Sequence, residues 1–413
     1  MQMKLKLSFI LIIFFIAIRA QSKNDLNSEE KEYISKFIYP INTFNPEESD
    51  NNDLLILNKL IGNSTIVGLG ESTHGSSEVY QMKYRISKYL IAHKNFNVFS
   101  LEANMPESFL MNQYIQEGKG NPKDILKGMY FWLWQTEETL NFVEWLKKYN
   151  ENLDSKVFFD GFDMQYAKGA IDQIRKIYQE NHWSEQEIND LEKALKENNR
   201  GFRTYSKKGQ NTISEYLFLI KQKSISIKNP EEKSRFLQNV DIIRQYIELS
   251  FIKRDQFMAE NVKWMKENYQ NSKVIVSAHN YHIAKLKSDR MGYWINEMYN
   301  KDFVNFGFAF YEGTYSASID GKLGTYNSEK ARPGTLEYKL NSLDIPIFIL
   351  DLKAIRKDDN KLGHWVLKDI LFRKTGSGTD KNEFKKTNVA NSFDYLIFIN
   401  KSTNSKLLIG NSK

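Results

Sequence analysis

Two hydrophobic patterns alternate along this chain. Short runs of apolar residues, typical of buried strands, are followed by stretches in which apolar residues recur every three or four positions, as on one face of a helix. The first pair predicts a strand over 65–69 and a helix over 77–93, where Val79, Met82 and Ile86 share a face. This alternation indicates parallel strands joined by crossover helices.

The alternation runs to about residue 167 and resumes after residue 268. The predicted strands cover 65–69, 98–101, 157–159, 273–278, 303–311, 346–350 and 395–399. Between residues 168 and 268 we find only helical patterns, over 168–180, 185–198, 210–226, 231–252 and 255–270. We therefore expect an α/β fold with a mostly parallel central sheet, flanking helices and an inserted all-helical subdomain.

This pattern divides the chain into four segments. They are a signal peptide (1–21), the first half of an α/β core (22–167), a helical insertion (168–268) and the second half of the core (269–413). The insertion either supports the sheet or forms a wall or lid of a pocket, since such insertions often shape clefts.

The N-terminus has the pattern of a signal peptide. Lys4 and Lys6 precede the apolar run Leu7–Ile18, and Ala20 is a small residue near a cleavage point. The run has about 12 residues, fewer than the roughly 20 that span a bilayer. We expect export to the periplasm or outside the cell, without stable membrane insertion after cleavage. An uncleaved anchor is the alternative.

Composition narrows the chemistry. The chain has no Cys, which excludes disulfides, thiolate metal sites and a Cys nucleophile. Removing the leader, with Lys4, Lys6 and Arg19, takes the net charge from +7 to +4. Basic and acidic residues are interspersed without a long basic run, so we expect no nucleic-acid partner.

Four predicted strands end in side chains that can transfer protons or carry charge. In chain order these are Glu71 and His74, then Glu102, then Asp163, and then His279 and His282. Ligands of open parallel sheets bind outside the carboxyl ends of the strands. We therefore expect these side chains to converge on one edge of the sheet.

These residue types suit hydrolysis by activated water. A neutral His can take a proton from water, and a carboxylate can orient that His. A second His, Lys83 or Arg85 could donate to a developing oxyanion. The chain has no Gly-x-Ser-x-Gly elbow, which argues against a serine hydrolase, and Ser72 is too close in sequence to His74 to be a convincing nucleophile.

Each candidate also has a structural alternative. These are capping for Glu71, burial for His74, an ion pair with Arg85 for Glu102, capping for Asp163, and a shared helix face for His279 and His282. The aromatic segment 129–134, which includes Trp134, is either core or a substrate wall. Two His and two carboxylates could also hold a divalent metal, although no His-Glu-x-x-His signature is present.

Four motifs in order resemble the erythromycin esterase family. They are Gly70–Gly75, Ser100–Ala103, Gly161–Gln165 and Ala278–His282. The segments Trp134–Glu137 and Gly307–Gly313 are also similar, and the resemblance extends over about residues 55–400. It implies a parallel α/β core with a helical subdomain. It also implies hydrolysis of the lactone ester of macrolide antibiotics by His-activated water, without an essential metal or other cofactor.

The resemblance also assigns roles. His74 becomes the general base, Glu71 and Glu102 position it or the water, and His279 becomes the second essential imidazole. Lys83 stands where some of these esterases have Arg, so the residue that orients the substrate or oxyanion is in question. The expected substrate-binding set is Lys83, Arg85, Asp163, His282 and Trp134.

We therefore expect an exported, metal-independent carboxylic ester hydrolase that acts on a macrolide-like or other bulky amphipathic ester, with macrolide resistance as one role. The first alternative is a metal-dependent hydrolase or peptidase on the same scaffold. The second is a non-catalytic protein that binds a hydrophobic ligand.

Overall fold

The computed structural model describes residues 25–151, 156–201 and 203–408. The expected signal peptide at 1–21 lies outside these residues. Within the described ranges, no helix combines the length and the apolar composition needed to cross a membrane.

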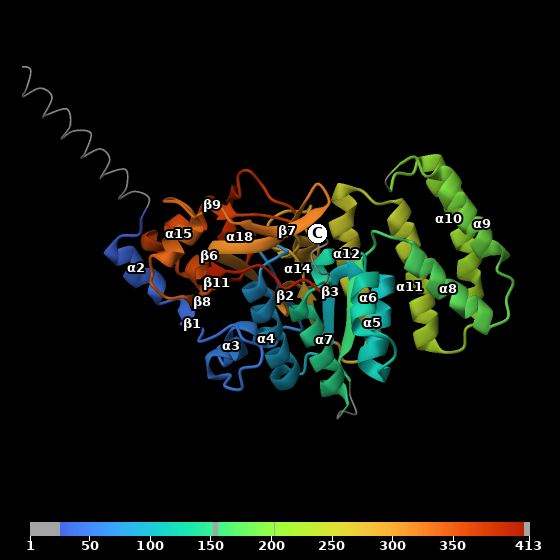
Figure 1. Cartoon of the computed structure of the whole chain (residues 1–413), viewed down its shortest axis with the longest axis horizontal. Helices are drawn as coiled ribbons and strands as arrows, with labels where there is room; N and C mark the ends of the chain where they lie inside the picture. Colours follow the sequence, from blue (N-terminus) through green and yellow to red (C-terminus); the bar gives the residue numbers. More distant parts are fainter. Residues whose placement is uncertain (1–24, 152–155, 202, 409–413) are drawn as a thin grey trace, which may run out of the picture.

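A single large sheet forms the centre of the fold (Figure 1). Its order is β1-β8-β11-β6-β2-β5-β3-β4, and β7 pairs with β6. The strands from β11 to β4 are parallel, whereas β8 and β1 extend the sheet antiparallel. The predicted mostly parallel central sheet is therefore confirmed. The strands are β1 (Ile38–Pro40), β2 (Ile66–Leu69), β3 (Val98–Asn104), β4 (Phe158–Asp163), β5 (Val274–Ser277), β6 (Phe303–Ile319), β7 (Lys322–Asn327), β8 (Ile347–Asp351) and β11 (Tyr395–Ser402).

Helices flank the sheet on both faces, and a small hairpin of β9 (Ile370–Arg373) and β10 (Phe384–Thr387) lies apart from it. The longer helices are α2 (Ser28–Ser35), α4 (Ser77–Lys94), α5 (Met105–Glu117), α7 (Glu137–Asn150), α8 (Lys168–Glu180), α9 (Gln186–Asn198), α10 (Lys207–Gln222), α11 (Pro230–Ile247), α12 (Phe251–Asn268) and α14 (Met291–Tyr299). The shorter ones are α3 (Leu57–Ile61), α6 (Pro122–Gly128), α13 (Asn280–Ile283), α15 (Leu336–Asn341), α16 (Leu352–Asp358), α17 (His364–Leu367) and α18 (Val389–Ser392).

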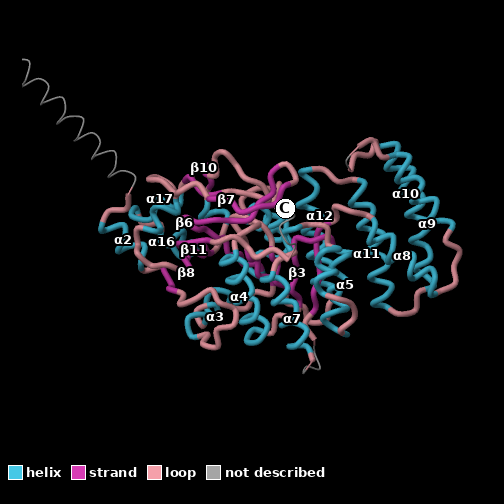
Figure 2. The backbone as a smooth tube through the Cα atoms, in the orientation of Figure 1, coloured by secondary structure: helices cyan, strands magenta, loops and turns pink. Residues whose placement is uncertain are grey.

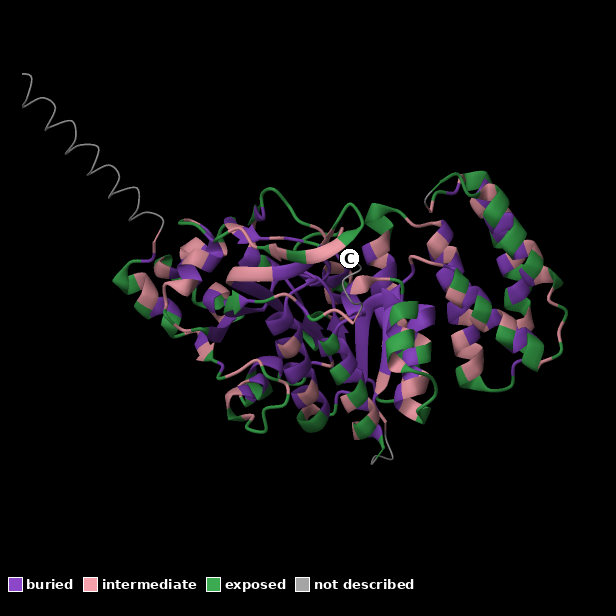
Figure 3. Ribbon diagram, viewed as in Figure 1, coloured by how far each residue is buried: buried purple, intermediate pink, exposed green. Residues whose placement is uncertain are grey.

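The two faces of the sheet bury separate cores. In β5, Val274 and Val276 pack into the core that includes α12 and α14, whereas Ile275 packs into the core that includes α4 and α7. Successive strand residues point to opposite faces, so a sheet covered on both sides needs uninterrupted apolar strands. Figures 2 and 3 show the buried strands enclosed by helices. This explains why the strand runs were recognisable in the sequence.

The helices of the 168–268 region fall into two groups. Helices α8 to α11 pack on one another at one end of the molecule (Figure 1). Helix α12 instead packs against β4, β5 and α14. The predicted helix over 210–226 is divided, because α10 ends at Gln222 and a 3-10 turn follows.

The predicted strand over 303–311 is too short. Strand β6 continues to Ile319, and its second part forms a hairpin with β7. Residues 312–319 carry mostly small and polar side chains, and beyond residue 313 β6 pairs with β7 rather than with β11. The apolar pattern that marks a buried strand therefore stops before the strand does.

The turn between β2 and α4 is held by backbone contacts from distant segments. The carbonyl of Gly75 accepts from the N–H groups of Ser316 (2.9 Å) and Ser405 (2.8 Å). The carbonyl of Glu71 accepts from the N–H of Asn280 (2.9 Å). A Cβ on Gly75 would lie 1.9 Å from the carbonyl oxygen of Ser316, so this close approach requires glycine.

We expect Gly75→Ala to reduce the free energy of unfolding by about 1–3 kcal/mol, because the methyl group would force backbone apart. Gly128→Ala is the matched control, since a Cβ at that position would meet no atom of the described residues within 4 Å. Urea unfolding of both variants tests this. Equal midpoints for the two variants would show that the turn tolerates a side chain.

Candidate active site

A carboxylate that is fully buried lies at the carboxyl end of β2. The Nδ1 atom of His74 lies 2.6 Å from Oε1 of Glu71, and the ammonium group of Lys83 on α4 binds Oε2. Burial opposes ionisation of Glu71, but Lys83 and His74 outweigh it and lower the pKa of Glu71 to about 2. Glu71 is therefore a carboxylate at neutral pH.

This contact fixes the tautomer of His74. Because an ionised carboxylate can only accept hydrogen bonds, Nδ1 of His74 carries a proton, and in the neutral imidazole the lone pair is then on Nε2. Within the described part of the chain, no protein group hydrogen bonds to Nε2. The residue is 8% exposed. The Nε2 atom of a largely buried imidazole is thus available to water or a ligand.

Tyr80 stabilises the backbone of His74. The hydroxyl of Tyr80 donates to the carbonyl oxygens of His74 (2.8 Å) and Leu133 (3.2 Å). Trp134 packs edge-on to the Tyr80 ring, with ring centroids 6.4 Å apart, and it is fully buried. Trp134 therefore contributes to the core behind the turn rather than to an exposed wall.

The second imidazole, His279, follows β5 and lies beside His74. Their ring centroids are 5.0 Å apart. Nε2 of His279 donates to the carbonyl of Thr375 (2.7 Å), and Nδ1 accepts from the N–H of Tyr281 (3.1 Å). Burial, together with the field of His74, lowers the pKa of His279 to about 3. His279 is neutral, and as placed neither nitrogen is free to take a proton.

A network of charged side chains adjoins this pair. Arg254, at the start of α12, donates to Oε1 of Glu102 (2.9 Å) and to Oδ2 of Asp163 (2.7 Å). Nε2 of His282 lies 3.1 Å from Glu102, and its Nδ1 lies 2.8 Å from Asp255. Complementary charges therefore join the ends of β3 and β4 to helices α12 and α13.

The network gives its members fixed charges. Burial opposes ionisation of Glu102, but His282 and Arg254 hold its pKa well below the usual range. Burial also disfavours the charged form of His282, yet Glu102 and Asp255 raise its pKa to about 9. His282 is therefore an imidazolium at neutral pH. Oε2 of Glu102 accepts from the N–H of His279 (3.0 Å), which connects the network to the first pair.

Most of the predicted site residues lie together at this edge of the sheet. The residues brought together are Glu71, His74, Lys83, Glu102, Asp163, His279 and His282. Trp134 lies behind them. The structural alternatives of helix capping for Glu71 and Asp163 are wrong, because Ser76 caps α4 and the N-cap residue of α8 is Ala167.

Arg85 does not reach the site. Its guanidinium binds both oxygens of Asp53 (2.7 and 2.8 Å) and the carbonyls of Thr43 and Asp50. Positions two apart on a helix point about 200° apart, so α4 can direct only one of Lys83 and Arg85 toward the turn. The suggested ion pair between Arg85 and Glu102 is therefore wrong, and Arg254 takes that place.

Sequence reasoning missed Arg254, Asp255 and Thr375. Arg254 and Asp255 lie on α12 within a stretch of charged residues that resembles a solvated helix face. Thr375 contributes a backbone carbonyl, which no side-chain pattern can reveal. All three residues act through contacts between elements that are far apart in the sequence, and only knowledge of those contacts would have identified them.

The donor atoms here are mostly engaged with one another. Among the described residues, no three His, Asp or Glu side chains are arranged to hold a metal ion. Nδ1 of His74, Nδ1 of His282 and both nitrogens of His279 already have protein partners. What the geometry offers is one free imidazole nitrogen beside a set of fixed charges.

Comparison with known proteins adds a family to this geometry. The model of the family described as "Erythromycin esterase" matches residues 91–402. YbfO of Bacillus subtilis (strain 168), provisionally named a hydrolase, is 25% identical over 85% of this chain and 88% of its own. Erythromycin esterase type II of Escherichia coli is 22% identical over 83% of this chain and 94% of its own. The family and these names indicate a hydrolase.

Solved structures share the fold. A Bacillus cereus protein superposes with a TM-score of 0.79 at 26% identity, over 92% of this chain and 98% of its own. A mutant of the erythromycin esterase EreC in its open conformation superposes with a TM-score of 0.67 at 16% identity, over 89% of this chain and 98% of its own. These likenesses confirm the fold class.

We expect Arg85→Met to reduce the free energy of unfolding by about 3–5 kcal/mol, because it leaves buried Asp53 without its partner. Denaturant unfolding measures the loss. Asp53→Asn in the same background is the control and should recover part of it, because the uncompensated carboxylate is gone. An unchanged unfolding midpoint in Arg85→Met would contradict this role.

A second prediction concerns pH. The pKa of His282 rises from 6.5 in the unfolded chain to about 9 in the fold, so its contribution to stability is fully present below about pH 6.5 and is lost as the pH approaches 9. We expect His282→Gln to remove this decrease in stability. Unfolding midpoints measured from pH 6 to 9.5 test it, and parallel profiles for the two proteins would refute it.

Proposed function

This chain belongs to the erythromycin esterase family, and from that premise we propose that it hydrolyses carboxylic esters with water activated by His74. The observation that carries the proposal is the arrangement of His74. Its Nδ1 is held by the buried Glu71 carboxylate, and its Nε2 is free of protein partners within the described residues. A general base needs this combination of a fixed tautomer and an open lone pair.

The reaction follows from that geometry. Nε2 of His74 takes a proton from water as the water oxygen attacks the ester carbonyl carbon. The resulting imidazolium is stabilised by the Glu71 carboxylate at 2.6 Å. The tetrahedral intermediate collapses, the alkoxide leaves, and it receives the proton from Nε2. The products are a carboxylic acid and an alcohol, and His74 returns to its neutral form.

For Lys83 we propose a positioning role in place of substrate binding. It is fully buried and bound to Glu71, so in this proposal its ammonium group keeps Glu71 ionised. Arg254 is the cation closer to solvent, with a side chain 22% exposed. We assign stabilisation of the developing oxyanion to Arg254, which is held in place by Glu102 and Asp163.

The substrate class in this proposal is a macrolactone or another bulky amphipathic ester. The support is the name of the Escherichia coli relative and the family itself. Export through the N-terminal segment would place such an enzyme where a macrolide arrives before it reaches the ribosome, and a resistance role is part of the proposal. Other extracellular esters suit the same chemistry.

Removal of the base tests the mechanism. We expect His74→Ala to lower kcat/KM for a cleaved ester by about 10²- to 10⁴-fold, the usual contribution of a positioned general base. The control is His364→Ala. His364 lies on α17 and pairs near the surface with Asp359, which is not a residue of the site. A panel of macrolides and simple 4-nitrophenyl esters supplies the substrates. Equal rates for the His74 variant and wild type would exclude His74 as the base.

Chelation separates the alternative classes. Activity that survives exhaustive treatment with a chelator supports the metal-independent reaction, whereas loss that divalent ions restore would favour a metal-dependent hydrolase or peptidase. Tight binding of a hydrophobic ligand without turnover across the whole panel would favour a binding protein.

A further inference from the structure

A pocket of about 220 Å³ lies next to the segment that follows β5. Its walls come from α13, the loop before α14, the β9–β10 hairpin and the end of α18. Apolar side chains of Ala284, Phe372 and Phe393 line it together with cationic ones. The cationic residues are Lys287, Arg290, Lys374 and Lys386.

Most of these cations lack a carboxylate partner. Arg290 is the exception, because Asp289 lies 2.7 Å away and its guanidinium stacks on Tyr281. No ion pair within 4 Å links Lys287, Lys374 or Lys386 to any described carboxylate. Asp369 is the acidic residue of the lining, and it is exposed, as are Lys287 and Lys386. The pocket therefore carries excess positive charge.

The excess positive charge affects the pKa of Lys374. Its ammonium group lies 4.6 Å from the centre of the Tyr281 ring, in a partly buried position. Burial lowers the pKa of Lys374, and the positive charges of Arg290 and Lys287 lower it further. Like charges gathered without a counter-ion destabilise one another, and a bound anion would relieve that repulsion.

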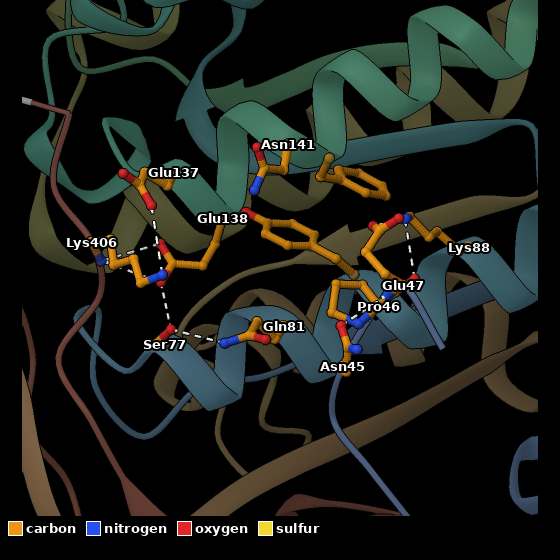
Figure 4. A pocket seen from close by; sticks show the side chains of 12 residues that line it. Asn45, Pro46, Glu47, Ser77, Gln81, Lys88, Glu137, Glu138, Asn141 and Lys406 are labelled. Carbon is orange, nitrogen blue, oxygen red and sulfur yellow. Dashed lines mark hydrogen bonds and ion pairs between the residues drawn. The ribbon is translucent and has the colours of Figure 1, made fainter. Parts of the chain in front are cut away.

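A second pocket of this protein has charged side chains that are paired with one another. Between α4 and α7, Lys88 pairs with Glu47 at 2.6 Å, and Glu138 accepts from Ser77 and from the N–H of Lys406 (Figure 4). The charged groups of this pocket are therefore paired. The pocket beside α13 differs, because its three lysines have no such partner among the described carboxylates.

The cationic pocket shares its wall with the proposed active site. Tyr281 and Lys374 line the pocket, and their chain neighbours include His279 and Thr375. The side chain of His279 is hydrogen bonded to the carbonyl of Thr375 at 2.7 Å. The two segments that position the second imidazole therefore also form the pocket.

We propose that this pocket is a subsite for an anionic group, a carboxylate or phosphate, carried on the apolar part of the ester that is cleaved at His74. The inference rests on the proposed esterase function for its catalytic half. The cations would bind the anion, and Ala284, Phe372 and Phe393 would contact the apolar chain next to it. A volume of about 220 Å³ is below the roughly 300–1,000 Å³ of sites that enclose whole drug-sized ligands, so it suits a substituent.

The subsite has a consequence for specificity. An ester that bears a protonated amine in this position would meet unpaired lysines and be repelled. An ester that bears a carboxylate or phosphate would be attracted. Among bulky amphipathic esters, the subsite would therefore favour those that carry an acidic group at this position.

Binding of non-reactive probes tests the pocket independently of catalysis. Hexyl phosphate, hexanoate and the neutral 1-hexanol are titrated by calorimetry into wild type and into Lys287→Glu/Lys386→Glu. We expect the anions to bind wild type, and the double variant to weaken that binding at least about tenfold. Comparing the two anions shows which headgroup the pocket prefers.

The matched control is Lys322→Glu/Lys401→Glu, which makes the same charge change at exposed positions on β7 and β11. It should bind as wild type does, and thermal unfolding checks that both variants are folded. Equal affinity for hexyl phosphate and 1-hexanol, or the same loss in both double variants, would overturn the proposal.

The catalytic arm compares mono-4-nitrophenyl succinate with neutral 4-nitrophenyl butanoate. We expect the pocket variant to raise KM for the anionic ester at least about fivefold and to leave kcat for the neutral ester unchanged, since charge reversal here removes binding and not the base. An equal change for both esters would overturn the subsite. If neither ester is cleaved while the anions still bind, the proposed esterase function fails and the anion pocket stands.

Discussion

The buried contact between Lys83, Glu71 and His74 is the interaction on which the site depends. Three ionisable side chains are placed where water is scarce, and each is tolerable only because of its neighbour. Removing Lys83 would leave a buried carboxylate without its cation, and removing Glu71 would leave a buried ammonium. The strand, the turn and the register of α4 must all be correct at once for the contact to form.

The three imidazoles at this edge of the sheet have three different sets of hydrogen-bond partners. His74 has a carboxylate at Nδ1 and an open Nε2. His279 has backbone groups at both nitrogens and stays neutral. His282 lies between two carboxylates and stays charged. Environment alone separates the roles, as it does wherever one residue type supplies both acid and base functions.

The sequence was informative where burial leaves a clear pattern. Strands covered on both faces must be continuously apolar, so β2, β3 and β5 and the polar residues after them could be recognised. It was uninformative where a partner is chosen by tertiary packing. Arg85 and Lys83 are similar cations two residues apart, and only the rotation of α4 decides which one meets Glu71. Arg254 and the carbonyl of Thr375 were invisible for the same reason, because their function depends on what the fold places opposite them.

The turn at residues 70–76 draws backbone partners from residues 403–405. The N–H of Ser405 binds the carbonyl of Gly75, and the N–H of Ser77 binds the carbonyl of Thr403. During synthesis, a ribosome has made more than three hundred further residues before these partners exist. The nascent protein can form its early helices and strands long before then, but the turn that carries His74 cannot be complete until residues 403–405 have left the ribosome.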